Sequence, residues 1–223
     1  MINKAALRDA ATVIVLRDRS SVLMGQRGKS AAFMPGKFVF PGGAVDPQDA
    51  AVTMPPMNPR CANRLRSESR IPNAALTAAA IRELWEETGQ ILGTPGQWDQ
   101  PAPGWEEFAA SGFYPDPSAL SFFFRAVTPI GRPRRFDARF FLVDASNLAT
   151  DLDDFSNAED ELSHLQWVPL KDTRRFDLPF ITKVVLSELI AHIARDTPIS
   201  SVPFFRNNDE AHLISRLGGT DAL

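Results

Sequence analysis

The sequence predicts an α/β fold in which a mixed β-sheet lies between two flanking helices, that is, an α/β/α sandwich. Short apolar runs rich in β-branched residues are bounded by polar turns, and they indicate strands. Two longer segments, residues 74–88 and 179–195, instead repeat apolar residues at helical spacing. A chain of 223 residues with 44% hydrophobic content is long enough to bury such a core in one domain with insertions.

The expected strands begin with a hairpin near the N-terminus. The run Ala-Thr-Val-Ile-Val-Leu at residues 11–16 is typical of a buried strand, and the polar residues 17–21 separate it from a second run at 22–27. The later runs that we expect to form strands are 38–40, 120–128, 135–144 and 165–168.

The two flanking helices have sequence signals at their ends. Asn73 is a suitable N-cap for the helix 74–88, and Gly89 fits the position just after its last residue. We expect Asp177 to cap the helix 179–195. The shorter helical pieces that we expect are 62–69 and 105–110.

We expect a single domain over residues 1–196, with an insert at about residues 50–73, and a C-terminal extension over residues 197–223. Many of the 18 prolines lie in the insert or just beyond the first long helix, and they indicate loops rather than a boundary between domains. The extension contains Pro203-Phe204-Phe205-Arg206 and is too apolar for a free tail. We therefore expect it to pack on the domain or on a partner subunit.

Composition argues against several classes of function. The net charge of −3 gives no support for nucleic-acid binding. No apolar run approaches the ~20 residues of a membrane span. The N-terminus also lacks a signal-peptide pattern, so we expect a cytoplasmic protein with no membrane partner. The lone Cys61 excludes an intrachain disulfide framework and a cysteine metal site.

The most informative stretch is Arg-Glu-Leu-Trp-Glu-Glu-Thr-Gly at residues 82–89. It places the carboxylates of Glu83, Glu86 and Glu87 on one face of a helix. Like charges at this spacing repel by roughly 0.2–0.5 kcal/mol per pair. A divalent cation among them would make the cluster favourable, and hard oxygen ligands suit Mg²⁺ or Mn²⁺. Taken alone, such a triplet is most often a solvated acidic face.

A glycine pair upstream changes that interpretation. The strand at 38–40 ends at Pro41, and Gly42 and Gly43 allow the backbone to approach another group closely. A strand, a glycine turn and a helix that carries carboxylates together fit a phosphate and metal site.

These residues belong to a longer pattern that resembles the signature of the Nudix hydrolases. That signature is Gly, five residues, Glu, seven residues, and then Arg-Glu-apolar-x-Glu-Glu-x-Gly-apolar. Gly43 matches the first glycine, and Asp49 falls on the first Glu position as a conservative departure. Gln90 departs at the last, apolar position. The matching positions of the second half are Arg82, Glu83, Leu84, Glu86, Glu87 and Gly89.

The spacing of the two halves is the larger departure. Between Asp49 and Arg82 lie 32 residues where the family has seven, which leaves 25 extra residues. In this respect the chain is similar to the long-insert Nudix proteins that resemble the mammalian peroxisomal coenzyme A diphosphatase, over about residues 10–195. The resemblance implies the Nudix-type sandwich. We expect the insert to loop out near the site, where it can shape substrate choice.

The resemblance also implies a reaction and roles for named residues. The reaction is hydrolysis of a diphosphate linkage in a nucleoside diphosphate derivative, assisted by Mg²⁺ or Mn²⁺. Glu83, Glu86 and Glu87 are the expected metal ligands and catalytic residues, and one of them or a carboxylate outside the signature is the base. Arg82 is expected to pair with a glutamate and fix its rotamer. The backbone carbonyl of Gly42 is a further candidate ligand.

Nudix sites often recruit another acid from the second half of the chain. Glu159, Asp160 and Glu161 lie just before the strand at 165–168. We favour Glu161 as this additional metal ligand, and then Asp160. The alternative is that all three are solvated loop acids.

The expected substrate contacts are mainly cationic. Four arginines cluster in residues 132–139, and two of them, Arg135 and Arg139, share one face of a strand and suit bidentate contact with phosphate. Salt bridges to the insert are an equal alternative for them. Arg27 is a candidate phosphate contact, and Gly43 offers close approach to the backbone. The coenzyme A-type pattern before the glycine pair matches only in part, so coenzyme A is a candidate substrate.

Three classes of function are compatible with these features. A metal-dependent diphosphohydrolase is favoured, because modules that only sense a nucleotide usually lose signature acids and this chain keeps Glu83, Glu86 and Glu87. A catalytically weak nucleotide-sensing module is the alternative, and an interaction scaffold is weaker still. The expected ligand is a small nucleoside diphosphate derivative. The resemblance and the apolar extension lead us to expect a homodimer.

Overall fold

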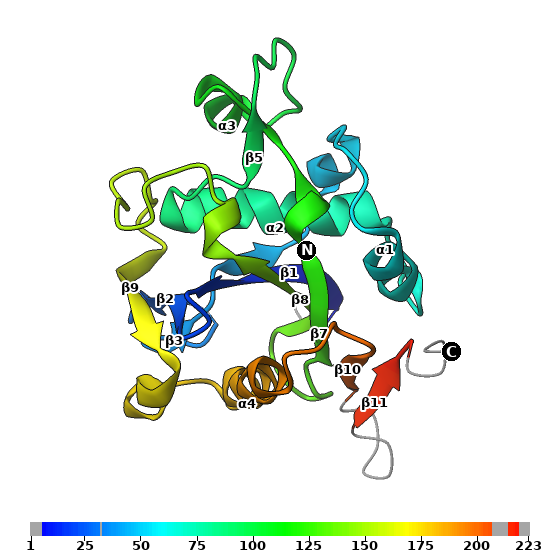
Figure 1. The fold of residues 1–223 in the computed structure, drawn as a ribbon, viewed down its shortest axis with the longest axis vertical. Helices are drawn as coiled ribbons and strands as arrows, with labels where there is room; N and C mark the ends of the chain where they lie inside the picture. The colour runs from blue at the N-terminus through cyan, green and yellow to red at the C-terminus, as the bar shows by residue number, and fades with distance from the viewer. Residues whose placement is uncertain (1–5, 32, 207–213, 219–223) are drawn as a thin grey trace.

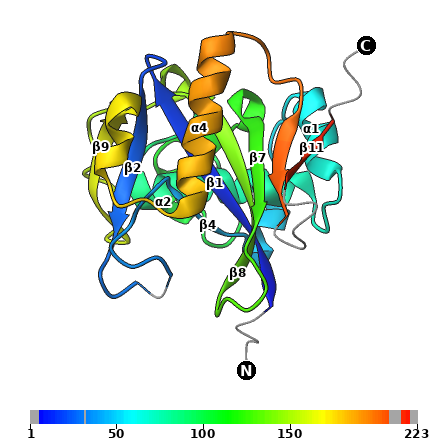
Figure 2. The ribbon, with the colours of Figure 1, turned by 90° about the horizontal axis from the view of Figure 1, so that it is seen from below.

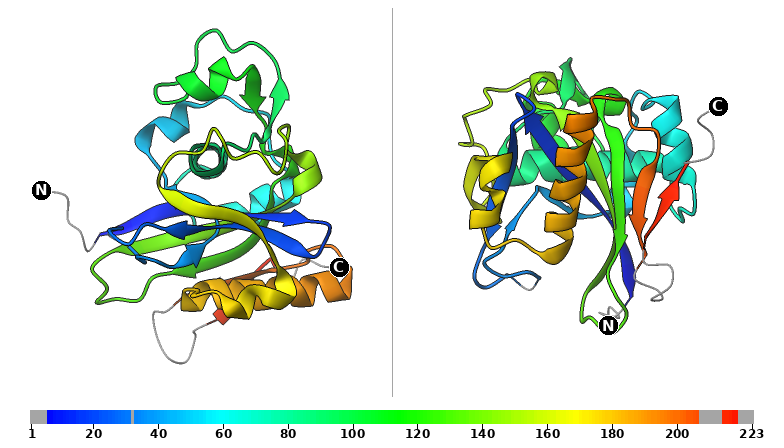
Figure 3. Two further views of the ribbon diagram at one scale, coloured as in Figure 1. Left: turned by 90° about the vertical axis from the view of Figure 1, so that its left-hand side faces the viewer. Right: turned by 60° about the horizontal axis from the view of Figure 1, so that its bottom comes forward.

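The central feature of the computed structural model is a nine-stranded sheet with helices on both of its faces (Figure 1). The structure describes residues 6–31, 33–206 and 214–218. Seen along the sheet, one long helix lies above it and another below it (Figure 3). This arrangement confirms the predicted α/β/α sandwich.

The sheet is mixed, as predicted. Its strands are β1 (Leu7–Arg17), β2 (Ser21–Arg27), β3 (Phe38–Val39), β4 (Gly42–Ala44), β7 (Ser121–Val127), β8 (Arg135–Asp144), β9 (Leu162–Pro169), β10 (Val202–Phe205) and β11 (Ile214–Leu217). The path across it runs β11, β10, β7, β8, β1, β2, β3, while β4 pairs with β1 and β9 pairs with β2. The pairs β1–β8 and β7–β10 are parallel, and the other pairs are antiparallel.

A split between β1 and β2 makes room for the glycine turn. β1 pairs with β2 only at Leu16 and Arg17, and its other half pairs with β4 at residues 10–12. The backbone N–H of Val13 donates to the carbonyl of Pro41 at 2.8 Å, which holds the turn in this gap. The split thus brings residues 41–44 onto the middle of the sheet.

The helices include two long ones that cover opposite faces of the sheet, α2 (Asn73–Thr88) and α4 (Phe180–Arg195). Figure 2 shows α4 lying along one face, with α2 behind the sheet. The shorter helical segments are η1 (Pro47–Ala51), α1 (Pro59–Arg66), α3 (Glu106–Ala110), η2 (Pro117–Ala119), η3 (Ala145–Asn147) and η4 (Leu170–Arg175). The strands β5 (Gly93–Pro95) and β6 (Phe113–Pro115) form a separate hairpin beside α3.

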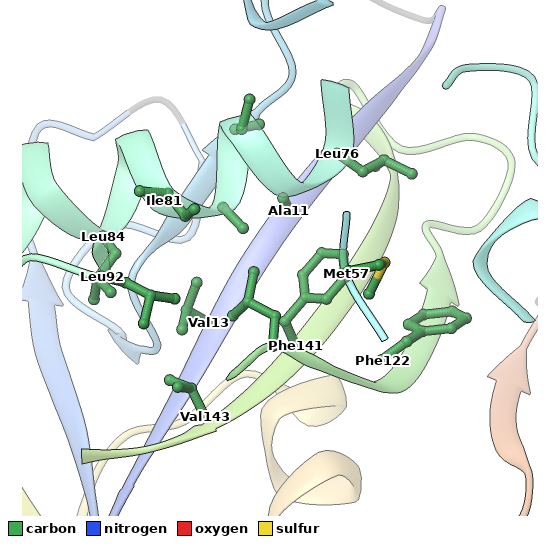
Figure 4. Close-up of a cluster of buried hydrophobic side chains, with 14 of the residues drawn as sticks. Ala11, Val13, Met57, Leu76, Ile81, Leu84, Leu92, Phe122, Phe141 and Val143 are labelled. Carbon is green, nitrogen blue, oxygen red and sulfur yellow. The ribbon is translucent and has the colours of Figure 1, made fainter. Parts of the chain in front are cut away.

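Two apolar clusters fill the sandwich, one on each face of the sheet. Successive residues of β1 alternate between them: Val13 and Val15 belong to the α2 side, whereas Ile14 and Leu16 belong to the α4 side. Figure 4 shows the α2 cluster, where Leu76, Ile81 and Leu84 of the helix face side chains of the strands. Full burial of each such side chain stabilises the fold by about 1.5–3 kcal/mol.

Both predicted N-caps are wrong, although both helices form. Pro72 is the N-cap of α2, and the Asn73 side chain instead donates to the carbonyl of Ala62 at 2.7 Å. Pro179 is the N-cap of α4, and Asp177 instead accepts from Lys37 Nζ at 2.6 Å. In each case a tertiary partner takes the side chain that could have capped the helix.

The insert and the C-terminal extension lie next to each other. The helix α1 packs beside β7 and the start of α2, and β10 and β11 extend the sheet beyond β7. Arg206, just after β10, makes two charged hydrogen bonds to Glu68 at 2.6 Å each. Residues 207–213 and 219–223 of the predicted C-terminal extension lie outside the described residues. No helix of the described part of the chain has the length and hydropathy needed to cross a membrane.

Candidate active site

The acidic helix face is set by the last turns of α2. The helix ends where Gly89 adopts a left-handed conformation with φ of 70°, and its N–H donates to the carbonyl of Trp85 at 2.7 Å. Gly89 thus ends the helix as predicted. In these last turns of α2, Glu83 and Glu87 are buried, whereas Glu86 is half-buried. A solvated acidic face does not describe this arrangement.

Arg82 organises two of the three glutamates. The residue is 5% exposed, and its guanidinium donates to Glu83 at 3.0 Å and to Glu86 at 2.9 Å. It also grips Asp49 of η1 with two hydrogen bonds at 2.9 and 3.1 Å and donates to the carbonyl of Ala44 at 3.1 Å. Burial lowers the pKa of Arg82, but the hydrogen bond to Asp49 and the surrounding carboxylates outweigh it and raise this pKa above its ordinary value.

The position of Asp49 shows why the site tolerates the interruption of the signature. Asp49 is fully buried, and its carboxylate also accepts from the N–H of Asp46 at 2.8 Å, which closes the first turn of η1. The first acid of the signature therefore reaches Arg82 despite the 32 residues between them. The insert leaves the site after η1 and returns at the start of α2, so it does not disturb this contact.

Glu83 and Glu87 lie against the glycine pair. The N–H of Gly42 donates to one carboxylate oxygen of Glu87 at 2.7 Å, and the other oxygen is buried with no hydrogen-bond partner. A Cβ atom on Gly43 would overlap the carboxylate of Glu83. A side chain at position 43 would therefore displace that carboxylate, whereas a Cβ on Gly42 would strike the backbone of β1.

Crowding shifts the ionisation of all three glutamates. Burial raises the pKa of Glu83 to about 7, with Glu86 adding to the rise and Arg82 opposing it. Burial also raises the pKa of Glu86, against Arg82. The pKa of Glu87 is raised well above its usual range by burial and then by the charge of Glu83. Neighbouring carboxylates whose pKa values are raised by burial are typical of functional sites.

Arg27 and Glu161 close the other side of this carboxylate group. Arg27, at the end of β2, donates to Glu161 at 2.7 Å and lies 3.9 Å from the unpartnered oxygen of Glu87. Glu161 lines the same groove as Glu83, and its charge adds to the raised pKa of both Glu83 and Glu87. The structure therefore brings Glu161 to the site, whereas the structure gives Asp160 no interaction with it.

A groove of about 740 Å³ leads away from these residues on the α4 side of the sheet. At the site its walls include Arg27, Gly42, Gly43, Glu83 and Glu161. Its apolar walls come mainly from β1, β3, β8 and the start of α4. The residues that give it aromatic or large apolar surface are Phe33, Met34, Val39, Phe40, Phe136, Phe140, Phe180, Ile181 and Phe205. The further cations on its walls are Arg8, Lys37, Arg132 and Arg134.

The other predicted substrate contacts do not lie on this groove. Arg139 is fully buried and pairs with Asp9 and Asp137, so a direct contact with substrate is not supported by its placement. Arg135 donates to the carbonyl of Thr128 at 3.2 Å and is absent from the groove walls. Arg139 therefore points from β8 into the protein interior, where it forms ion pairs with these two aspartates and does not face a phosphate.

The walls that sequence reasoning missed come from segments far apart in the chain. Lys37, Phe33 and Phe180 meet at the groove, although no motif links them. The insert contributes none of the walls among the described residues, since no residue of 50–73 lines the groove. The expectation that the insert can shape substrate choice therefore gains no support from the walls of this groove and stays a prediction.

The donor set fits a hard divalent cation in kind. Glu83 and Glu87 present carboxylate oxygens beside the glycine turn, and one buried oxygen of Glu87 has no hydrogen-bond partner, which leaves it available to a cation. Among the described residues, no three acidic, histidine or cysteine side chains already converge at ligand distance. The reason is visible in the contacts, because Arg82 holds Glu86 and one oxygen of Glu83.

Comparisons with known proteins identify the family. The NUDIX domain model matches residues 72–189, which is more than half of the 223 residues. The chain therefore belongs to the NUDIX domain family. The match begins at the end of the insert, so it contains the acidic helix but not the glycine pair.

Two relatives support this assignment. The Caenorhabditis elegans protein named "Putative nudix hydrolase 7" is 32% identical over 180 residues, which cover 74% of this chain and 52% of that protein. The chain thus spans about half the length of this curated relative. A crystal structure of a NUDIX hydrolase from Alicyclobacillus acidocaldarius has a TM-score of 0.63 at 30% identity, covering 86% of this chain and 97% of that one. This structural likeness confirms the Nudix-type sandwich.

Proposed function

We propose that this chain is a Mg²⁺- or Mn²⁺-dependent hydrolase that cleaves a diphosphate linkage in a nucleoside diphosphate derivative. The observation that carries the proposal is the meeting of Glu83 and Glu87 at the glycine pair, where a groove begins. Family membership supports the same reaction class. The buried, partly unpaired carboxylates give a divalent cation a reason to bind here.

The residues divide the work of hydrolysis among them. A bound divalent cation would neutralise phosphoryl oxygens and lower the pKa of the attacking water. Arg82 keeps Glu83 and Glu86 in fixed rotamers, and the Gly42 N–H does the same for Glu87. Glu161 is half-exposed at the groove, where it or a glutamate of α2 accepts the proton of the water. Arg27 lies beside them and offers its charge to a phosphate.

Coenzyme A is the substrate that we propose for testing first. It joins a diphosphate to a nucleotide with an extra phosphate on one side and to a long, nearly neutral arm on the other. The groove offers both cations, such as Arg132 and Arg134, and aromatic surface, such as Phe136 and Phe180. A chain of this kind would resemble the long-insert subgroup in substrate as well as in spacing.

A substrate panel with a matched pair of variants tests the proposal. Coenzyme A, ADP-ribose, NADH and dinucleoside polyphosphates are incubated with Mn²⁺, and the phosphate monoesters released are measured. We expect Glu86→Gln to lower kcat by about 10²-fold or more, because the divalent cation that assists the reaction would lose an anionic ligand. Glu107→Gln, an exposed glutamate of α3, should keep full activity. Turnover of no member of the panel by the unaltered chain would contradict catalysis.

The alternative is a nucleotide-sensing module with weak or no turnover. It predicts that ADP-ribose or coenzyme A binds with Mn²⁺ in calorimetry while no product forms over hours. Retention of Glu83, Glu86 and Glu87 in an organised, partly buried arrangement favours the enzyme. A sensor has no need of three carboxylates whose charges repel one another.

A further inference from the structure

Two arginines neutralise the acidic site, and they are held very differently. Arg82 makes five hydrogen bonds to protein oxygens and is enclosed by them. Arg27 has one short charged contact, 2.7 Å to Glu161, and a long one, 3.9 Å to Glu87. Its Nε is buried with no hydrogen-bond partner. Arg82 is therefore a fixed part of the structure, whereas Arg27 has unused donors.

The longer of the two contacts of Arg27 is with a carboxylate oxygen of Glu87 that has no hydrogen-bond partner. The Oε1 atom of Glu87, which is the nearer oxygen to Arg27 NH1, is buried and accepts no hydrogen bond. A guanidinium at 3.9 Å supplies charge to that oxygen but no hydrogen bond. The pair is thus an electrostatic contact without directional bonds, and a small divalent cation would satisfy the oxygen better.

Arg27 also faces the groove in which a substrate would lie. Its side chain is 16% exposed and forms part of the groove wall together with Glu83 and Glu161. Glu161, its firmer partner, is 53% exposed and stands at the rim. The guanidinium can therefore shift from Glu87 toward the groove while it keeps a partner.

We propose that Arg27 is the resident counter-cation of Glu87, that a divalent cation displaces it, and that the displaced guanidinium then binds an anionic phosphate in the groove. The proposal rests on the proposed function, because it assumes a divalent cation at Glu87. It makes cation and diphosphate bind cooperatively through one side chain. Each ligand then favours the state of Arg27 that the other requires.

Divalent binding without turnover tests the first half of the proposal. Free Mn²⁺ is measured by electron paramagnetic resonance during titration of the protein at constant ionic strength. We expect Arg27→Gln to bind Mn²⁺ about tenfold more tightly than the unaltered chain, because no cation has to leave Glu87. Arg27→Lys keeps the charge and should therefore bind Mn²⁺ less tightly than Arg27→Gln. It serves as a second variant in case Arg27→Gln fails to fold.

Lys37→Gln is the matched control. Lys37 lines the same groove and carries the same charge, but it pairs with Asp177 at 2.6 Å rather than with the acidic site. Its loss should change Mn²⁺ affinity less than twofold, or about 0.4 kcal/mol. Equal tightening in the two variants would overturn the proposal in favour of a general field effect.

The second half is tested with α,β-methylene-ADP, a diphosphate that resists cleavage at the bridging position. In the unaltered chain, saturating Mn²⁺ should tighten binding of this probe several-fold more than it does in Arg27→Gln. Mn²⁺ affinity in Arg27→Gln that is unchanged or weaker overturns the inference alone. Absence of any Mn²⁺ binding by the unaltered chain overturns the proposed function as well.

Discussion

Arg82 and Gly43 show how single residues determine the geometry of the site. Arg82 holds Asp49, Glu83 and Glu86 from one guanidinium, and Gly43 leaves the space that the Glu83 carboxylate occupies. The backbone of Gly43 has no left-handed φ, so glycine is required there by space rather than by conformation. The two residues thus act on the same carboxylate, that of Glu83.

Replacement of Gly43 by alanine tests this steric requirement. The new methyl group would overlap the end of a flexible side chain, so the Glu83 carboxylate has to move while the backbone stays in place. We expect Mn²⁺ affinity to fall about tenfold or more, with a small change in Tm. Gly28→Ala is the control, because nothing lies closer than 4.0 Å to a Cβ there and no left-handed φ is involved. Equal Mn²⁺ affinity in both variants would show that Glu83 does not depend on Gly43.

At the scale of secondary structure, the sequence predicts the elements better than their contacts. The long helices and the strand Arg135–Asp144 follow from periodicity, because local apolar spacing decides which face is buried. Periodicity could not predict that Arg139 forms a buried ion pair with Asp9. Strand spacing places Arg139 on a face, but only the register with β1 brings Asp9 beside it. The groove walls depend in the same way on pairings distant in sequence.

The insert illustrates the same limit and leads to a prediction. Leu65 of α1 is 1% exposed and belongs to the α2-side core, while no residue of 50–73 lines the groove. We expect Leu65→Ala to lower the free energy of unfolding by about 2–5 kcal/mol through a cavity. The ratios of kcat/KM among the substrates of the panel should stay unchanged. If these ratios shift while the free energy of unfolding changes little, the insert does contribute to substrate choice.

At the scale of the whole molecule, the site lies where both layers of the sandwich meet the sheet. The helix α2 carries the acids from one side, and the groove opens on the α4 side through the gap filled by β4. The buried acids therefore affect the stability of the whole fold as well as the chemistry of the site. Their charges oppose folding wherever no cation is bound.

This opposition predicts an unusual dependence of stability on pH for the metal-free protein. Burial raises the pKa of Glu83 from its ordinary 4.5 to about 7, so the folded state holds a proton that the unfolded state has released between these values. Stability must then fall as pH rises through this window, by on the order of 3 kcal/mol for Glu83 alone. Glu87, whose pKa is also raised, acts in the same direction. His192 acts in the opposite direction, since burial lowers its pKa.

Urea unfolding at pH 5 and pH 8 in the presence of a chelator measures the effect. Glu83→Gln should remove most of the Glu83 contribution, and the difference between the two proteins cancels the contribution of His192. Mn²⁺ should raise stability at pH 8 more than at pH 5, because it binds the ionised carboxylates of the folded chain. Identical pH dependence in the unaltered chain and in Glu83→Gln would mean that this carboxylate is ionised in the folded protein throughout, with Arg82 as a sufficient partner.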